Sequence, residues 1–239
     1  TAGYPETGST TGIIRDLAGA GVDLIEIGIP FSDPLADGPL IQKCSATALL
    51  NGMSLKLLFE QLGGIRNEIN IPLILMGYIN PVLKYGMENF CRKCAEIEVD
   101  GVILPDLPPE IYIDQYSGMF EKYNLYNILL ISPRSDPERI RMIDEISNGF
   151  IYVVSSSSTT GIRNGVIGSQ QSYFMRIKEM HLAKPQLIGF GISDSKSFYE
   201  ACSMSAGAII GSAFIKTLGE KGVGADTIKK FIGEIKGKC

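Results

Sequence analysis

The sequence predicts an α/β fold with a parallel sheet, and three observations lead to that prediction. Seven apolar runs of strand length recur along the 239 residues, and amphipathic helical patterns separate most of them. Strands that alternate with helices form βα units and a parallel sheet. The runs are almost continuously apolar, which is typical of strands covered on both faces. Since one domain can bury a chain of this length, we predict a single domain over residues 1–239.

Each strand-like run ends at a turn signal. The runs are Val22–Ile29, Pro72–Tyr78, Gly101–Leu107, Asn127–Ser132, Phe150–Ser155, Gln186–Ile192 and Ala206–Ala213. The clearest helical patterns are residues 8–20, Ser54–Ile69, Met87–Val99, Pro137–Ser147 and Ser172–His181. Apolar residues recur in them at helical spacing, and glycines close the first.

A closed (β/α)8 barrel of the TIM type requires eight strands. We expect the eighth to precede residue 1, because Thr1-Ala2-Gly3 is typical of the end of a strand and its loop. The first strand is therefore expected to be truncated at the N-terminus. An open doubly wound sheet is the alternative, and seven strands satisfy it as well.

Composition excludes several classes of function. A net charge of -4 without a block of like charges argues against nucleic acid as a partner. No apolar run approaches the ~20 residues of a membrane helix, and the N-terminus lacks the basic start and apolar core of a signal peptide. Five irregularly spaced cysteines are typical of a reducing compartment, so we expect a cytoplasmic protein.

Two features that could bind metal or act as a base favour a structural role. Cys91 and Cys94 form a CxxC on an amphipathic helical stretch without a second pair nearby, which favours helix packing over zinc. The single histidine, His181, ends a polar helical stretch and is expected at the surface. The sequence offers no His/Cys/Asp cluster, so we predict no metal and no organic cofactor.

The most informative stretch is IEIGIPFSDPLADGPLIQ, Ile25–Gln42. It sets Glu26 in the middle of an apolar run and follows it with a loop that contains three prolines, Asp33 and Asp37. An acid on a buried strand, followed by a stiff acidic loop, is how a barrel enzyme presents catalytic groups. The alternative is an acid at a strand edge followed by an ordinary surface turn.

Three segments in the second half predict an anion site. SSSSTTG, residues 155–161, follows an apolar strand, GFGIS includes Phe190 and Gly191, and Gly211 and Ser212 follow the last strand. The last two glycine-bearing loops each lead into a helix, whose first N–H groups and dipole favour anions. Barrel enzymes often bind substrate phosphate at this place.

The chain resembles the tryptophan synthase alpha subunit family over nearly all of its length. Ile25–Gln42 matches the family signature at almost every position, and GFGIS and GSA match its phosphate-binding stretches. Thr160 and Gly161 match the TG that closes its mobile loop, and LMGYINPVLKYG and ILPDLPPE match strand ends that line its indole pocket. The resemblance implies binding roles for Tyr152, Thr160, Gly161, Phe190, Gly191, Gly211 and Ser212.

The resemblance implies a lyase that cleaves indole-3-glycerol phosphate to indole and glyceraldehyde 3-phosphate in a retro-aldol step. Glu26 then corresponds to the acid–base that protonates the ring carbon, and Asp37 to the carboxylate that binds the indole N–H. Tyr152 matches a tyrosine near the acid. Such a reaction needs one acid with a raised pKa in a dry site and one carboxylate that stays ionised in a polar loop.

The resemblance also implies a partner, a pyridoxal-phosphate beta subunit in an alpha2beta2 heterotetramer, and the cofactor belongs to that partner. Ser156 and Ser158 depart from the family, where many members have arginine and glycine, so loop closure is the doubtful point. Two rival functions remain: a regulatory subunit that mainly activates its partner, and another phosphate-binding barrel enzyme such as a sugar-phosphate isomerase.

Overall fold

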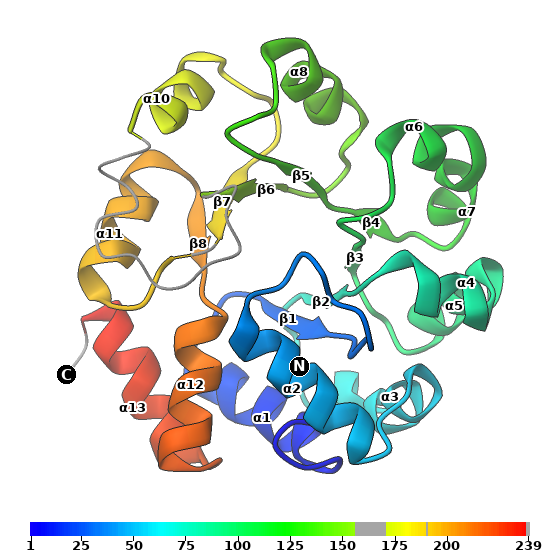
Figure 1. The fold of residues 1–239 in the computed structure, drawn as a ribbon, viewed down its shortest axis with the longest axis vertical. Coiled ribbons are helices and arrows are strands. Elements are labelled where there is room, and N and C mark those ends of the chain that lie inside the picture. The colour runs from blue at the N-terminus through cyan, green and yellow to red at the C-terminus, as the bar shows by residue number, and fades with distance from the viewer. Residues whose placement is uncertain (156–170, 190, 238–239) are drawn as a thin grey trace.

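The computed structural model describes residues 1–155, 171–189 and 191–237, and within them parallel strands form an inner wall ringed by helices (Figure 1). The strands are β1 Ile25–Gly28, β2 Leu73–Met76, β3 Gly101–Ile103, β4 Tyr126–Asn127, β5 Leu129–Ile131, β6 Ile151–Val154, β7 Gln186–Gly189 and β8 Gly207–Ile209. They pair in sequence order as two four-stranded sheets, β1-β2-β3-β4 and β5-β6-β7-β8. Every pairing is parallel.

Helices connect the strands in the order that the sequence predicts. They are α1 Ser9–Gly19, α2 Pro39–Leu50, α3 Leu55–Leu62, α4 Ile79–Tyr85, α5 Met87–Glu96, α6 Pro109–Ile111, α7 Ser117–Lys122, α8 Pro137–Ile146, α10 Gln171–Glu179, α11 Ser195–Met204, α12 Ser212–Lys221 and α13 Ala225–Lys236. A 3-10 turn, Ile65–Asn67, follows α3, and a π-helical turn, Tyr112–Tyr116, joins α6 to α7. No helix in the described part of the chain is long and apolar enough to cross a membrane.

The seven predicted strand runs are all present, and one of them joins the two sheets. The run predicted over Asn127–Ser132 is divided into β4 and β5, because it pairs with β3 through its first residues and with β6 through its last. Between them the Ile128 N–H donates to the Val102 carbonyl at 3.0 Å. Ile128 therefore connects the halves of one curved wall, as an α/β barrel requires.

The N-terminal residues lie beside β1. The Ala2 N–H donates to the Gly28 carbonyl at 2.8 Å, which places Thr1–Gly3 next to the end of that strand. No backbone ladder joins β1 to β8 within the ranges described above.

Two helix predictions needed shorter boundaries. The pattern over Ser54–Ile69 gives α3 and a separate 3-10 turn, because Gly64 between them is left-handed (φ +81°). The pattern over Met87–Val99 gives only α5, and Glu98, two residues past its end, has φ +57°. A left-handed residue cannot continue a right-handed helix.

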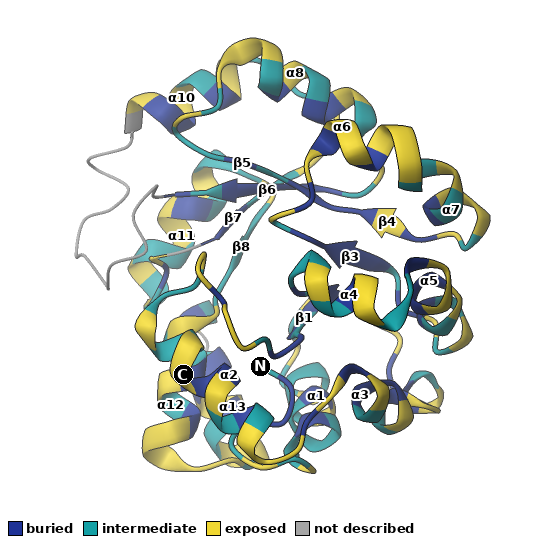
Figure 2. Cartoon of the chain, turned by 45° about the vertical axis from the view of Figure 1, so that its right-hand side comes forward, coloured by how far each residue is buried: buried dark blue, intermediate teal, exposed yellow. Residues whose placement is uncertain are grey.

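Most strand residues are buried or partly buried (Figure 2), and alternate residues of a strand face two apolar layers. The outer layers lie between the strands and the helices. The inner layer consists of Ile74, Ile103, Ile128, Phe150 and Tyr152, with partly buried apolar side chains around them. Successive side chains of a strand point to opposite faces, so each strand contributes to both layers. This double coverage explains the continuous apolar runs in the sequence.

We predict that Ile128→Ala lowers the free energy of unfolding by about 2–5 kcal/mol, because truncating a fully buried side chain leaves a cavity. Ile128 is 1% exposed. Urea unfolding followed by circular dichroism measures the change. Leu50→Ala is the control, since Leu50 is 88% exposed and its truncation should change stability by no more than about 0.5 kcal/mol. Equal effects of both substitutions would contradict the conclusion that the buried Ile128 side chain stabilises the junction of the two sheets.

Candidate functional site

Strand β1 directs Glu26 into the interior of the barrel. Its neighbours Ile25 and Ile27 pack in the outer layer beneath the helices. Since side chains alternate along a strand, Glu26 faces the inner side. There it lies in register with Ile74 of β2, a member of the inner apolar layer.

Glu26 is partly buried as a residue, and one of its carboxyl oxygens, Oε2, is fully buried. Among the described residues, its Oε2 atom has no hydrogen-bond partner. Burial raises the pKa of Glu26 to about 7, and the nearby Asp37 charge adds to the rise. A carboxyl with such a pKa carries a proton for a large fraction of the time at neutral pH, so it can act as an acid and then as a base.

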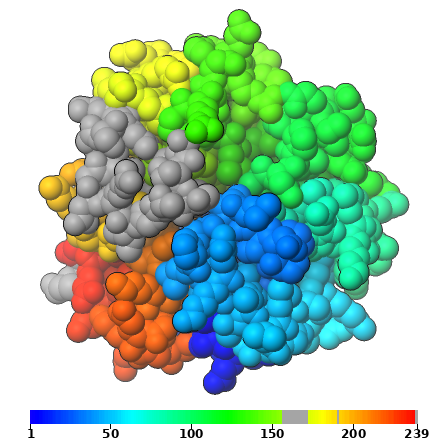
Figure 3. Space-filling view, viewed as in Figure 1, coloured from blue at the N-terminus to red at the C-terminus, as the bar shows by residue number. Residues whose placement is uncertain are grey.

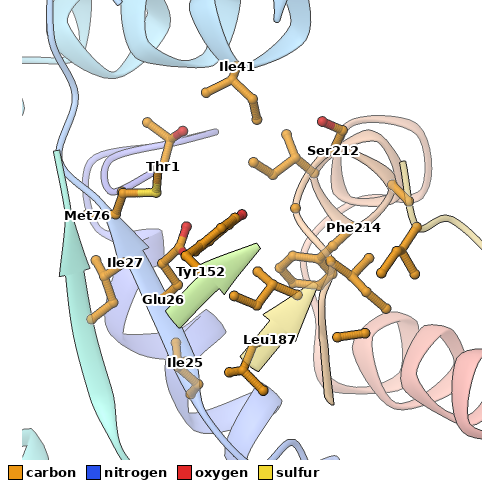
Figure 4. Close-up of a pocket in the computed structure, with 18 of the residues that line it drawn as sticks. Thr1, Ile25, Glu26, Ile27, Ile41, Met76, Tyr152, Leu187, Ser212 and Phe214 are labelled. Atoms are coloured by element: carbon orange, nitrogen blue, oxygen red, sulfur yellow. The ribbon is translucent and has the colours of Figure 1, made fainter. Parts of the chain in front are cut away.

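Tyr152 lies beside Glu26 (Figure 4). It stands on β6 in register with Leu130 and Leu187 and is 4% exposed. Burial, together with the Glu26 and Asp37 charges, raises the pKa of its hydroxyl. A Cβ at Gly189 on β7 would lie 2.2 Å from the Tyr152 hydroxyl, so only glycine at that position leaves room for the ring.

Asp37 reaches the same interior from the loop after β1. Its Oδ2 accepts a hydrogen bond of 3.1 Å from the Tyr78 hydroxyl. Burial raises the pKa of Asp37, and the Tyr78 bond opposes that rise. The sequence predicts that Asp37 stays ionised in a polar loop; the structure adds that this loop partly buries the carboxylate, which opposes its ionisation.

The two carboxyl groups differ in their partners. Glu26 Oε2 has none among the described residues, whereas Asp37 has a hydroxyl donor. A hydrogen bond to the charged form favours ionisation, and burial without one favours protonation. The pair is therefore arranged with Glu26 as the group that holds a proton at neutral pH and Asp37 as the better stabilised anion.

One cavity joins most of the predicted site residues. Glu26, Asp37, Tyr152, Gly191, Gly211 and Ser212 all line it. It measures about 1660 Å³, larger than a typical ligand pocket of about 300–1,000 Å³. It also extends past β1 and β8 to apolar side chains of α13, so it is larger than the reaction site alone. The segment before and through α2, drawn in blue, lies over the centre of this face (Figure 3).

The two helix starts predicted to bind an anion, those of α11 and α12, differ in their caps. The start of α11 is already capped, because the Asp194 carboxylate accepts from the Ser197 N–H at 2.8 Å. The Ser197 N–H group is therefore taken, and the role of this helix start in binding an anion stays a prediction. The start of α12 differs: Gly211 precedes it and no side-chain cap is present there among the described residues. Its first N–H groups can bind an anion beside Gly191, which is left-handed at φ +78°.

Several predicted residues cannot be placed. Thr160, Gly161 and Phe190 lie outside the described residues, as do Ser156 and Ser158. Sequence reasoning assigned the stretch around Tyr78 to the pocket lining but missed its contact with Asp37. The sequence shows only that Tyr78 is an aromatic residue just after a strand, and this does not indicate that it binds Asp37, 41 positions earlier.

The residues considered for metal binding occupy structural positions. Cys91 and Cys94 are buried on the inner face of α5, and burial raises the pKa of both thiols. Helix packing accounts for the CxxC, as predicted. His181 is exposed, also as predicted. Within the described residues no group of three or more His, Cys, Asp and Glu side chains is placed to hold a metal ion.

Comparison with known proteins assigns the chain to a family. Residues 1–236 match the family profile described as "Tryptophan synthase alpha chain". The chain belongs to the tryptophan synthase alpha chain family. It is 57% identical over 235 residues to the tryptophan synthase alpha chain of Flavobacterium psychrophilum, covering 98% of this chain and 92% of that one. Identity to that of Flavobacterium johnsoniae is 56% over 236 residues, with 99% and 92% coverage.

Solved structures of the family have the same fold. The tryptophan synthase A-subunit from Pyrococcus furiosus superposes with a TM-score of 0.88 at 31% identity, covering 99% of this chain and 95% of that one. A chain of Mycobacterium tuberculosis tryptophan synthase gives 0.88 at 30% identity, with 99% and 89% coverage. The fold is the α/β barrel that the sequence predicts, and the open doubly wound alternative was wrong.

We predict that Glu26→Gln stabilises the folded chain above neutral pH. The folded carboxyl keeps its proton up to about pH 7, whereas an unfolded one loses it near the ordinary glutamate pKa of 4.5. The folded state binds more protons in that interval, so the wild type loses stability as pH rises through it. The difference corresponds to about 3 kcal/mol. Urea unfolding at pH 4 and pH 8 measures it, and a variant with no advantage at pH 8 would contradict the prediction.

Proposed function

We propose that the Glu26 and Asp37 carboxyl groups carry out the family reaction in this chain. The family assigns the reaction itself: the chain is a carbon–carbon lyase of tryptophan biosynthesis, and it cleaves indole-3-glycerol phosphate to indole and glyceraldehyde 3-phosphate. The observation that carries the assignment of roles is the buried Glu26 carboxyl, which has a pKa of about 7 and faces the same cavity as Asp37.

In the proposed mechanism the proton of Glu26 goes to the indole ring carbon that bears the side chain. The ring then carries a positive charge at its nitrogen, and the Asp37 carboxylate accepts the N–H bond and stabilises that charge. Glu26, now ionised, takes the proton of the adjacent hydroxyl. The carbon–carbon bond breaks, its electrons restore the aromatic ring, and a carbonyl forms on the leaving glyceraldehyde 3-phosphate.

The missing hydrogen-bond partner of Glu26 Oε2 supports this role. A carboxyl already bound by a protein donor would be held ionised and turned away from the substrate. Glu26 instead lies beside the Tyr152 ring and among apolar side chains (Figure 4). A dry, apolar surrounding raises its pKa, so the carboxyl still carries a proton to give to carbon at neutral pH.

We propose that the substrate phosphate binds at the start of α12. The first N–H groups after Gly211, the Ser212 side chain and the Gly191 backbone line the cavity at that end. Thr160, Gly161 and Phe190 complete the proposed site by resemblance. A phosphate there would leave the indole ring to reach inward toward Glu26, because phosphate and carboxyl residues line one continuous space.

The family normally pairs with a beta subunit, and we propose an alpha2beta2 heterotetramer in the cytoplasm. The loop Pro30–Pro39 supports a docking role because Leu35 on it is 83% exposed. Large exposed apolar side chains are common at protein interfaces. The pyridoxal phosphate of the assembly belongs to the beta subunit, and this chain needs no cofactor of its own for proton transfer.

We predict that Glu26→Gln and Asp37→Asn each lower kcat for indole release by at least about 100-fold, because a positioned acid–base contributes about 10²–10⁴. Indole release from indole-3-glycerol phosphate is measured with and without a beta subunit. Asp33→Asn is the matched control, since Asp33 is an exposed acid of the same loop. It should retain wild-type turnover.

Two results would contradict the proposal. If the wild type releases no indole but still accelerates the beta subunit's own reaction, the chain is a regulatory subunit. If Glu26→Gln turns over substrate at the wild-type rate, the acid–base is another group.

A further inference from the structure

We propose that Tyr78 is a positioning residue that holds Asp37 in its reactive place through two hydrogen bonds. The proposal rests on the proposed function of Asp37 and adds a residue to it. Tyr78 follows β2, whereas Asp37 belongs to the loop after β1. The Tyr78 hydroxyl donates to Asp37 Oδ2 at 3.1 Å and accepts from the Ala36 N–H at 3.0 Å.

These two bonds determine the direction of the hydroxyl proton. A tyrosine has one O–H to donate and oxygen lone pairs to accept with. The Ala36 N–H occupies the acceptor side, so the proton points to Asp37. The bond to a charged acceptor is of the stronger kind and favours the ionised carboxylate that the reaction needs.

The ring of Tyr78 adds a third contact to the same loop. It packs against Phe31 with ring centroids 5.2 Å apart and planes tilted by 33°. Tyr78 thus contacts the beginning of the loop through its ring and the end of the loop through its hydroxyl. One side chain from a neighbouring strand end therefore fixes both ends.

The loop has few other bonds to the barrel. Its own contacts are local, from Leu35 N–H to Asp33 and from Asp37 N–H to Pro34, and the Gln42 side chain binds the Asp37 carbonyl at 2.9 Å. Within the described part of the chain, Tyr78 is the one side chain beyond residues 30–42 that hydrogen-bonds to residues 31–38. Without it, no side chain from another strand end in the described ranges holds the Asp37 carboxylate, and the Gln42 bond reaches only the Asp37 backbone.

Other charged groups face this pair and must be considered in a pH experiment. Glu26 on β1, Tyr152 on β6 and the amino group of Thr1 interact electrostatically with Asp37. Asp106, after β3, interacts with Tyr78. Of these, Glu26 titrates near neutrality and must be protonated to act as the acid, so it accounts for the alkaline limb of the activity profile. Asp37 must be ionised, so it accounts for the acid limb.

We predict that Tyr78→Phe moves the acid limb of kcat/KM to higher pH by about one unit and leaves the alkaline limb in place. The hydroxyl stabilises ionised Asp37, so its removal raises the pKa of Asp37. Below the limb, kcat/KM should fall about tenfold, since a pKa of Asp37 that is about one unit higher leaves about a tenth as much of it ionised there. The phenylalanine ring keeps the Phe31 contact, so the fold should remain intact by circular dichroism.

The matched control is Tyr85→Phe. Tyr85 lies on α4 and packs against Phe59 at 5.4 Å, away from Asp37. It should show the wild-type pH profile. Hydrogen exchange of the backbone amides of residues 31–38 provides a second measurement that does not need activity. Exchange should be faster in Tyr78→Phe than in the Tyr85→Phe control and in the wild type.

An unchanged acid limb in Tyr78→Phe, even with lower turnover at all pH values, would overturn the proposal, because a purely structural defect has that signature. If the wild type shows no indole release, the proposed function fails separately and the exchange measurement decides. Unchanged exchange of residues 31–38 would then overturn the anchoring by Tyr78.

Discussion

The whole arrangement depends on parallel strands that are covered on both faces. Every strand must supply apolar side chains outward to the helices and inward to the barrel interior. At Glu26 one inward position carries a carboxyl instead, opposite Ile74 and beside Tyr152. The fold thus places an acid among apolar side chains, and the same burial of its carboxyl that costs stability raises its pKa. Stability and reactivity are opposed at this position.

Much of the fold follows from local patterns in the sequence. The apolar runs locate the strands because double coverage leaves little room for polar residues, and helix starts such as Asp136 before α8 cap their helices as such residues usually do. The division of Asn127–Ser132 at Ile128 was not predictable, because it depends on neighbours on two sides that lie far away in the sequence. The break at Gly64 could have been predicted from the glycine pair alone.

The sequence predicted that Glu26 has a raised pKa in an apolar setting, but it did not predict the surroundings of Asp37. Glu26 and Asp37 are recognisable from the motif, yet the burial of Asp37 arises only when the loop folds over the barrel. The capping of α11 by Asp194 shows the opposite case. An aspartate three residues before Ser197 is a visible N-cap signal, and it indicates that one N–H group at this helix start is already bound.

The contact between Gly189 and Tyr152 has a consequence for how the family can vary. The missing side chain at Gly189 creates the space that the Tyr152 ring occupies, and the ring carbons are as close to a Cβ there as the hydroxyl is. Removing the hydroxyl alone would not make room for alanine. The two positions on adjacent strands are therefore expected to covary: a larger residue at 189 becomes tolerable only in lineages where position 152 has first lost its aromatic ring.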